Sequence, residues 1–318
     1  MIESKIVNCL LNSDGIAIVS HENPDGDCIG SMLALYLALT KKGKSVRMFL
    51  KNNIPKNLSF LPAVDKIEIK EKLEEMFDVL VLLDTGELER TGIKNIQNCY
   101  KKLINIDHHI TSEGIGDYYY INSSAAATGE IIYQLVKLMG IDSDKDIATC
   151  LYTSIFTDTG GFRYSNTTSI THQIAGDLIN MGIDFVYIIN RVFEEMSLSK
   201  FNLLKDALQT LELFEDGKIA FLTITRQMLE KNNASRDETE NIINFAKNIE
   251  GVEVAALFIE EDDRTKVSLR SKYYVDVATI SREFGGGGHP RAAGFSMNNS
   301  DISQIKKRLL QRLKSDVK

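Results

Sequence analysis

The chain has 318 residues, of which 43% are hydrophobic and 25% charged, a composition that is typical of folded globular proteins and excludes a disordered or fibrous chain. Its formal net charge is −7, and the acidic excess lies in residues 1–200, with 19 basic and 26 acidic side chains against 18 of each in 201–318. Proteins that coat nucleic acid non-specifically are usually basic. We therefore expect any nucleic-acid partner to be held in a local site.

No part of the sequence has the pattern of a membrane span or a secretory signal, since no run of about 18 apolar residues occurs. The four cysteines are scattered and form no CxxC pair: Cys9, Cys28, Cys99 and Cys150. This spacing disfavours a disulfide framework or a thiolate zinc site. We therefore expect a protein of the reducing cytoplasm.

Short apolar runs alternate with helical patterns in the first half of the chain, as in βαβ units that build a parallel sheet. We predict strands over 16–20, 45–50, 78–83 and 103–106, and a buried crossover helix over 30–39. From Ala125 to about Leu198 the apolar spacing is helical throughout. These patterns predict an α/β domain with a parallel sheet and a helical appendix.

The sequence MSLSK at 196–200 interrupts this apolar pattern, and a chain of this length commonly forms two domains. We expect a catalytic domain over 1–195, a linker over 196–203 and a second domain over 204–318. In the second domain, strands at 218–225, 252–260 and 265–271 alternate with short helices. It is therefore expected to be a smaller α+β domain, facing the first across a cleft.

Histidine and aspartate side chains follow three of the predicted strands at the point where each strand ends. His21, Asp25 and Asp27 follow the first strand, Asp84 follows the third, and the run Asp-His-His at 107–109 follows the fourth. An aspartate in this position is more often a helix N-cap than a ligand. Several carboxylates gathered at one edge of a sheet would nevertheless repel one another without bound cations. The sequence therefore predicts a metal site.

Asp158 is a further candidate ligand, because a negative charge at the end of an apolar helix opposes the helix dipole. Imidazole and carboxylate ligands without thiolates favour Mn²⁺ or Mg²⁺, with Mn²⁺ the leading expectation and Co²⁺ or Zn²⁺ as substitutes. The candidate ligands are too many for a single ion with open positions: His21, Asp25, Asp27, Asp84, His108 and Asp158. We expect two ions, roughly 3.5 to 4 Å apart, that share one carboxylate and act on a phosphoester.

The segment GGGGHPRAAG at 285–294 predicts an anion site in the second domain. Glycine lets backbone N–H groups approach a phosphate, and His289 and Arg291 supply side-chain donors; without these two side chains the glycines would rather indicate a hinge. Two further arginines are candidates, one on the predicted strand TKVSLRSK and one near Asp158. The predicted substrate-binding residues are Gly286, Gly287, Gly288, His289, Arg291, Arg270 and Arg163.

The segments HENPDGDCIGS, LLDTG, IDHH and TDTGGFRY resemble, in this order, the four motifs of the DHH phosphoesterase superfamily, and GGGGHPRAAG resembles the glycine-rich motif of its DHHA1 domain. The resemblance implies one ion on His21, Asp25 and Asp84. It implies a second ion on Asp27, Asp84, His108 and Asp158, so that Asp84 bridges the two. It further implies that His109 faces the scissile phosphate as general acid and that Asp107 orients an imidazole.

A chain with only these two domains resembles family members that cleave short oligoribonucleotides to mononucleotides and convert 3'-phosphoadenosine 5'-phosphate (PAP) to AMP. A phosphodiesterase for cyclic dinucleotides or for linear pApA stays open, because the motifs do not separate these activities. The chain is short for a RecJ-type exonuclease, and the DHHA1 motif disfavours an inorganic pyrophosphatase. Outside the enzymes, the alternative is a binding module that senses nucleotides without hydrolysing them. The expected partners are short RNA or nucleotide bisphosphates, and a homodimer stays open.

Overall fold

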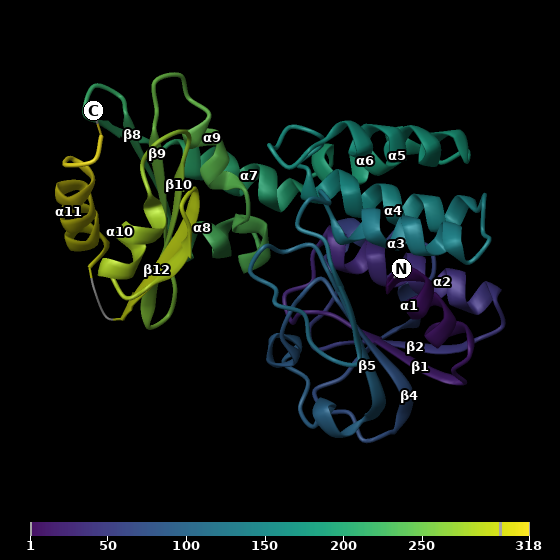
Figure 1. Ribbon diagram of the computed structural model, residues 1–318. Coiled ribbons are helices and arrows are strands. Elements are labelled where there is room, and N and C mark those ends of the chain that lie inside the picture. Colours follow the sequence, from purple (N-terminus) through teal and green to yellow (C-terminus); the bar gives the residue numbers. More distant parts are fainter. Residues whose placement is uncertain (1, 299–300, 318) are drawn as a thin grey trace. The chain divides into compact units, whose positions relative to one another are not determined.

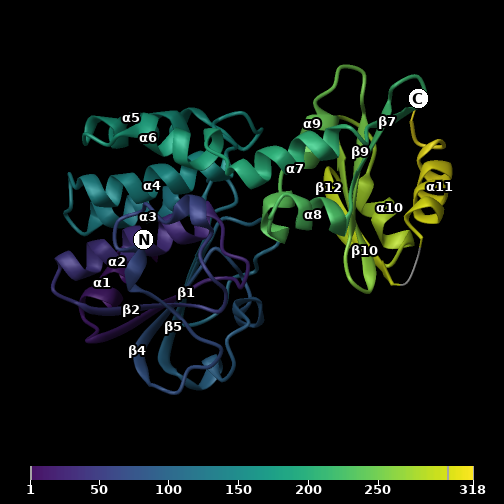
Figure 2. The same cartoon turned by 180° about the vertical axis from the view of Figure 1, so that it is seen from behind.

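The computed structural model of the protein describes residues 2–298 and 301–317. These residues form two compact units that divide between Glu195 and Met196 (Figures 1 and 2). Each unit is built on its own six-stranded sheet. Residues 196–203, predicted as a linker, are helical from Leu198 onward, because helix α7 (Leu198–Leu208) buries Leu203 and Leu204 in the core of the second unit.

The first unit contains a fully parallel sheet, which confirms the predicted α/β fold. Its strand order is β3-β2-β1-β4-β5-β6, and its apolar central strands are buried on both faces. The four predicted strands correspond to β1, β2, β4 and β5, and short strands are added at the two edges. The bounds are β1 (Gly15–Val19), β2 (Ser45–Leu50), β3 (Ile67–Ile69), β4 (Phe77–Leu83), β5 (Tyr100–Asp107) and β6 (Tyr118–Ile121).

Helices cover this sheet and continue into the predicted helical appendix. The predicted crossover helix is the interior of α2, which starts earlier than expected because Asp25 caps its N-terminus through the N–H of Cys28. The α-helices are α1 (Ile2–Leu11), α2 (Gly26–Lys41), α3 (Thr128–Leu138), α4 (Lys145–Asp158), α5 (Ser169–Asn180) and α6 (Phe185–Ile189). Short 3₁₀ helices η1 to η4 (Lys56–Leu58, Val64–Lys66, Leu88–Thr91, Ile96–Asn98) and the π-helix η5 (Asn190–Glu194) complete the unit.

Helices α2 and α4 pack in unusually close contact, and this brings polar groups of α4 to the start of α2. A Cβ atom at Gly30 would lie 2.5 Å from the carbonyl oxygen of Cys150 and 2.8 Å from the Cβ of Ser154. Only glycine fits this position without moving one of the helices. The close approach lets the hydroxyl of Ser154 reach the side chain of Asp27, one turn before Gly30.

The second unit is a mixed sheet with helices on both faces. Its strand order is β11-β12-β10-β9-β8-β7, and only β8 and β9 pair in parallel. One face forms an apolar core that includes α10 and α11, and the other face forms a core that includes α7 and α9. The strands are β7 (Glu212–Phe214), β8 (Ile219–Ile224), β9 (Val254–Glu260), β10 (Arg264–Ser271), β11 (Gly287–His289) and β12 (Ala292–Asn298). The remaining helices are α8 (Arg226–Lys231), η6 (Arg236–Thr239), α9 (Ile242–Lys247), α10 (Val277–Glu283) and α11 (Ile302–Leu313).

Among the helices of the described residues, none combines the length and the apolar character that crossing a lipid bilayer requires.

Candidate active site

The six predicted metal ligands lie together at the carboxyl edge of the parallel sheet in the first unit. His21 follows β1, Asp84 follows β4, and the run 107–109 begins at the last residue of β5. Together with His109, these six residues form three overlapping groups, within each of which all ligand atoms lie within 4.8 Å of one another. The groups are Asp84 with His108 and His109, His21 with Asp25 and Asp84, and Asp27 with His108 and Asp158.

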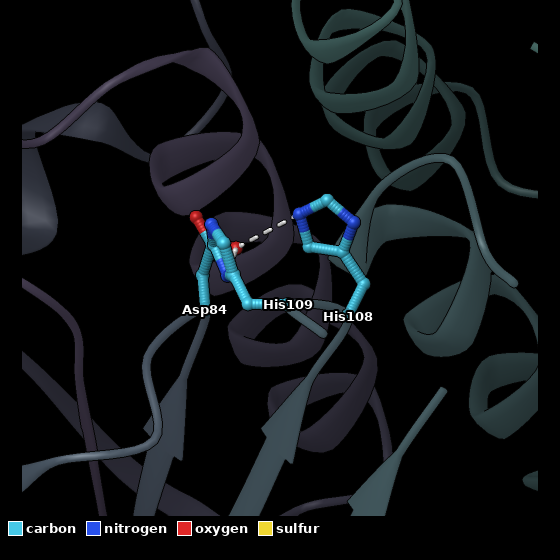
Figure 3. A group of neighbouring side chains, drawn as sticks. All are labelled: Asp84, His108 and His109. Carbon is cyan, nitrogen blue, oxygen red and sulfur yellow. Dashed lines mark ion pairs between the residues drawn. The ribbon is translucent and has the colours of Figure 1, made fainter. Parts of the chain in front are cut away.

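Asp84 lies at the centre of the cluster, and its two carboxylate oxygens face different partners. Oδ2 lies 3.4 Å from Nε2 of His21, whereas Oδ1 lies 3.6 Å from Nε2 of His108. Figure 3 shows the His108 imidazole directed at this carboxylate. The Asp84 backbone has a φ of 58°, a left-handed conformation that turns the chain sharply after β4 and that aspartate and asparagine tolerate better than most residues.

Asp27 is buried and is held by groups from three helices. Its Oδ1 accepts hydrogen bonds from the hydroxyls of Ser31 (3.1 Å) and Ser154 (2.5 Å) and from the N–H of Gly129 (3.1 Å). Its Oδ2 accepts from the N–H of Thr128 at 2.7 Å and lies 3.6 Å from Nε2 of His108. These donors fix the carboxylate with one oxygen toward the cluster.

Asn166 and the main chain orient the remaining ligands of this group. The Nδ1 of His108 lies 3.3 Å from the carbonyl oxygen of Ala125, so its Nε2 is directed at the carboxylates. The Oδ2 of Asp158 lies 3.7 Å from that Nε2 and accepts a hydrogen bond from Asn166 at 3.4 Å. Asn166 was not predicted from the sequence, because it lies in a loop without any periodic pattern.

His109 forms a dyad with Asp107. Oδ1 of Asp107, which is fully buried, accepts hydrogen bonds from Nδ1 of His109 at 2.7 Å and from the N–H groups of His108 and His109. The hydrogen bond to Asp107 raises the pKa of His109 above its ordinary value. The dyad therefore favours an imidazole that carries a proton near neutral pH, with Nδ1 occupied by Asp107.

A cavity of about 290 Å³ opens over these residues. It is lined by His21, Glu22, Asn23, Asp25, Asp84, Arg90, His109 and Asp158. Arg90 was missed by the sequence analysis, although an arginine six residues after the strand-end Asp84 is a signal that could have found it. The lining is mostly acidic and imidazole, which is the donor chemistry of hard divalent cations.

The charges of the cluster are not balanced by the protein alone. Burial and the neighbouring carboxylates raise the pKa of Asp84 well above its usual range, and the same two causes raise the pKa of Asp158 to about 8. Burial lowers the pKa of His21 and so favours the neutral imidazole that binds metals. Converging carboxylates beside the neutral imidazole of His21 fit divalent ions, because bound cations would relieve the repulsion among the carboxylates.

The raised pKa of Asp158 predicts that the metal-free protein loses stability as pH rises. Between the ordinary carboxyl pKa and about 8, the folded state holds a proton that the unfolded state has released, so the free energy of unfolding falls with pH. From pH 6 to pH 9 we expect a loss of about 3 kcal/mol, since the proton is retained over roughly two pH units at about 1.4 kcal/mol each, and this lowers the melting midpoint by about 8 °C.

Thermal unfolding in EDTA measures this loss, with Asp158→Asn as the comparison. The variant should lose less stability over this pH range than the parent protein, and Mn²⁺ should flatten the parent's profile. Identical pH profiles for the variant and the parent would show that Asp158 does not titrate in this way.

Arg163 does not line the cavity, although the sequence analysis placed it near Asp158. Its Nε donates to the carbonyl oxygen of Gly160 at 2.5 Å, and its guanidinium lies 5.6 Å from the centre of the Phe193 ring. These contacts anchor the turn that follows α4. A role for Arg163 in substrate binding stays a prediction.

In the second unit, strand register places Arg270 and His289 on the same face of the sheet. Both residues pair with Ala292, which lies on the strand between them, so they are two strand spacings, or about 10 Å, apart. Ser268 and Gly287 pair in the same way with Gly294. Small residues therefore form the strip of the sheet that lies between the Arg270 guanidinium and the His289 imidazole.

This strip continues the face that carries the apolar cluster of α7, α9, β8 and β9. Arg270 pairs with Ala255 and Ser268 with Leu257, and both partners belong to that cluster. Within the described residues, the cluster includes none from β10, β11 or β12. The side of the sheet that carries Arg270 and His289 therefore combines small residues with a guanidinium and an imidazole.

The other residues of the glycine-rich segment have structural contacts. A Cβ atom at Gly286 would lie 2.2 Å from the carbonyl oxygen of Gly294, so this glycine is required by packing. Arg291 donates to the carbonyl oxygen of Val275 at 2.6 Å and to the hydroxyl of Ser271 at 3.3 Å. Arg291 thus fastens the loop after β10, while Gly287 and Gly288 lie in β11.

Two domain families match the chain. The DHH family, N-terminal domain, matches residues 15–155, and the DHHA1 domain matches residues 216–316. The chain is 32% identical over 304 residues to the bifunctional oligoribonuclease and PAP phosphatase NrnA of Thermus thermophilus, covering 95% of this chain and 90% of the relative. It is 30% identical over 305 residues to the protein of the same name from Bacillus subtilis, covering 94% of each.

Solved structures show the same arrangement of elements. An exopolyphosphatase-related protein from Bacteroides fragilis matches with a TM-score of 0.90 and 27% identity, over 99% of this chain and 97% of that one. RecJ of Thermus thermophilus, crystallised with Mn²⁺, matches with a TM-score of 0.56 and 13% identity, over 96% of this chain and 53% of that one, which shows a shared fold alone. The chain therefore belongs to the DHH family of phosphoesterases, carries a DHHA1 domain, and is a hydrolase.

Proposed function

We propose that this protein uses two divalent ions, Mn²⁺ first, to hydrolyse short oligoribonucleotides to mononucleotides and to remove the 3'-phosphate of PAP. The observation that carries the proposal is the central position of Asp84, whose two oxygens face His21 on one side and His108 on the other. A carboxylate placed in this way can bridge two ions. The names of the two NrnA relatives, which extend over nearly the whole chain, support the two substrates.

The residues that would hold the ions follow from the groups described above. His21, Asp25 and Asp84 would hold one ion, and Asp27, Asp84, His108 and Asp158 would hold the other. Bound there, the ions would activate water and neutralise charge on the phosphoryl oxygens. Ser31, Ser154 and the start of α3 would keep Asp27 in place during turnover.

His109 would act as the general acid. Its Nδ1 is held by Asp107, so Nε2 is the nitrogen left to donate a proton to the leaving oxygen, and His109 lines the cavity. Asp107 would hold the ring orientation and stabilise the imidazolium form. Asp107 is therefore a positioning residue, and His109 is a catalytic residue of this proposal.

The second unit would bind the remainder of the substrate. Arg270 and His289 on the small-residue strip supply donors for a terminal phosphate, and Gly287 and Gly288 expose main-chain groups beside them. Arg291 would support this surface by holding the loop after β10. We also propose a cytoplasmic location, since all four cysteines are free, as in a reducing compartment.

Parallel time courses test the proposal. The purified protein is incubated with a 5'-labelled RNA dinucleotide, PAP, pApA or a cyclic dinucleotide, in Mn²⁺, in Mg²⁺ and in EDTA. We expect turnover of the dinucleotide and of PAP with either ion and none in EDTA. Exclusive turnover of the cyclic dinucleotide would replace the proposal with a signalling phosphodiesterase, and turnover in EDTA would contradict the metal assignment.

A further inference from the structure

Arg90 is the one arginine among the residues that line the cavity of the first unit, all of which lie in the described part of the chain. It lies in η3, six residues after Asp84, and lines the cavity together with His21 and His109. Its carbonyl oxygen accepts a hydrogen bond from the N–H of Glu22 at 2.8 Å. This bond ties η3 to the loop that carries His21, so the main chain of Arg90 has a fixed place beside the metal ligands.

The guanidinium of Arg90 is the one permanent positive charge among the eight residues that line the cavity, which all lie in the described part of the chain. The side chain is exposed, and no hydrogen bond or ion pair joins its guanidinium to another described residue. Nearby Lys51, in contrast, is paired with Glu22 at 2.9 Å. Arg90 therefore has its full set of donors available to an anion in the cavity.

The two proposed substrates differ in the anion that they bring to this site. The phosphate of a monoester such as PAP has three nonbridging oxygens, whereas a phosphodiester has two and a smaller negative charge. The carboxylates on the other walls repel both anions. The additional oxygen and charge of the monoester thus need an additional donor, and the planar guanidinium is the side chain best suited to that contact.

On the basis of the proposed function, we infer that Arg90 binds the nonbridging oxygen that a phosphomonoester has and a phosphodiester lacks. It thereby allows one site to accept both substrate classes. Without it, the site keeps the groups that a diester requires and loses the donor for the third oxygen. Arg90 is in this sense a specificity-determining residue for the phosphatase reaction.

The experiment compares Arg90→Ala and Arg90→Lys with the parent protein on both substrate classes. Arg47→Ala is the matched control, since Arg47 lies on β2, pairs with Glu68 on β3 and does not line the cavity. Removing one donor from a charged transition state commonly costs about 10²-fold. We expect kcat/KM for PAP to fall by about 100-fold in Arg90→Ala and by less in Arg90→Lys, with changes within about fivefold for the RNA dinucleotide. The control should match the parent.

Equal losses on the two substrates, or no loss on PAP, would overturn the inference. Two further measurements do not depend on the nucleotide substrates. The same comparison is made with p-nitrophenyl phosphate and bis-p-nitrophenyl phosphate, and binding of inorganic phosphate in Mg²⁺ is measured by calorimetry. Phosphate binding should weaken at least about tenfold in Arg90→Ala, and unchanged binding would contradict the inference. Failure of the parent protein on PAP and RNA together would instead count against the proposed function.

Discussion

Asp84→Asn should reduce hydrolysis of both the RNA dinucleotide and PAP by at least about 10³-fold, a barrier increase of about 4 kcal/mol. The reason is that Asp84 lies at the centre of the ligand groups, with one oxygen toward His21 and the other toward His108. An amide offers one weaker oxygen donor and an N–H₂ group in place of the second. Steady-state rates and Mn²⁺ binding by calorimetry measure the effect.

Asparagine is the suitable replacement because of the backbone at this position. Asp84 has a φ of 58°, which asparagine adopts readily and alanine does not, so Asp84→Ala would combine loss of the ligand with backbone strain. Asp216→Asn is the matched control, since Asp216 is an exposed aspartate with a φ of 52° in the other unit. The control should keep full activity. Retention of more than a tenth of the activity in Asp84→Asn would rule out the bridging role.

His109→Ala should lower turnover of the RNA dinucleotide by about 10²- to 10³-fold and have a much smaller effect on substrates that release p-nitrophenolate. A general acid matters most for a poor leaving group, and p-nitrophenolate departs without a proton. The hydrogen bond that His109 donates to Asp107 raises the pKa of His109, so in the parent protein the acid form is lost, and the rate falls, as pH increases through that pKa. The variant should lack this alkaline decrease.

The comparison of leaving groups separates this role from metal binding. Nδ1 of His109 also lies 3.7 Å from the Asp84 carboxylate, so a ligand role would produce equal losses on both substrates and weaker Mn²⁺ binding. His172→Ala is the matched control, because His172 does not line the cavity. The centre of its ring lies 5.1 Å from the centre of the Phe162 ring. If His109→Ala lost equal activity on the RNA dinucleotide and on the p-nitrophenyl substrate, His109 would be a metal ligand and not the general acid.

The position of the predicted ligands could be derived from the sequence because parallel βα topology determines it. A side chain that follows a strand of a parallel sheet lies at one edge, whatever the rest of the chain does, and this brought His21, Asp84 and the 107–109 run together. The parallel sheet itself was predictable from the alternation of apolar runs and helical patterns. These are local signals that tertiary contacts reinforce.

The groups that hold these ligands could not be predicted in the same way. Asp27 receives hydrogen bonds from Thr128 and Ser154, which are 101 and 127 residues away along the chain. A serine on an apolar helix or an N–H at a helix start carries no sign of its partner in the sequence. Helix α7 was not predicted for a related reason, since the MSLSK run at its start interrupts the apolar pattern and conceals the buried Leu203 and Leu204.

The pairing of β10, β12 and β11 fixes how many residues the glycine-rich segment can have. It constrains this length more tightly than it constrains which residue types occur there. His289 and Ala292 are joined by two residues, and their pairing places His289 on the face that carries Arg270. Because alternate residues of a strand point to opposite faces, insertion or deletion of one residue between His289 and Ala292 would move the imidazole to the face packed against α10 and α11. Among homologues, a gap between these two residues would therefore signal loss of the proposed phosphate site even where the histidine and Arg270 and Arg291 are retained.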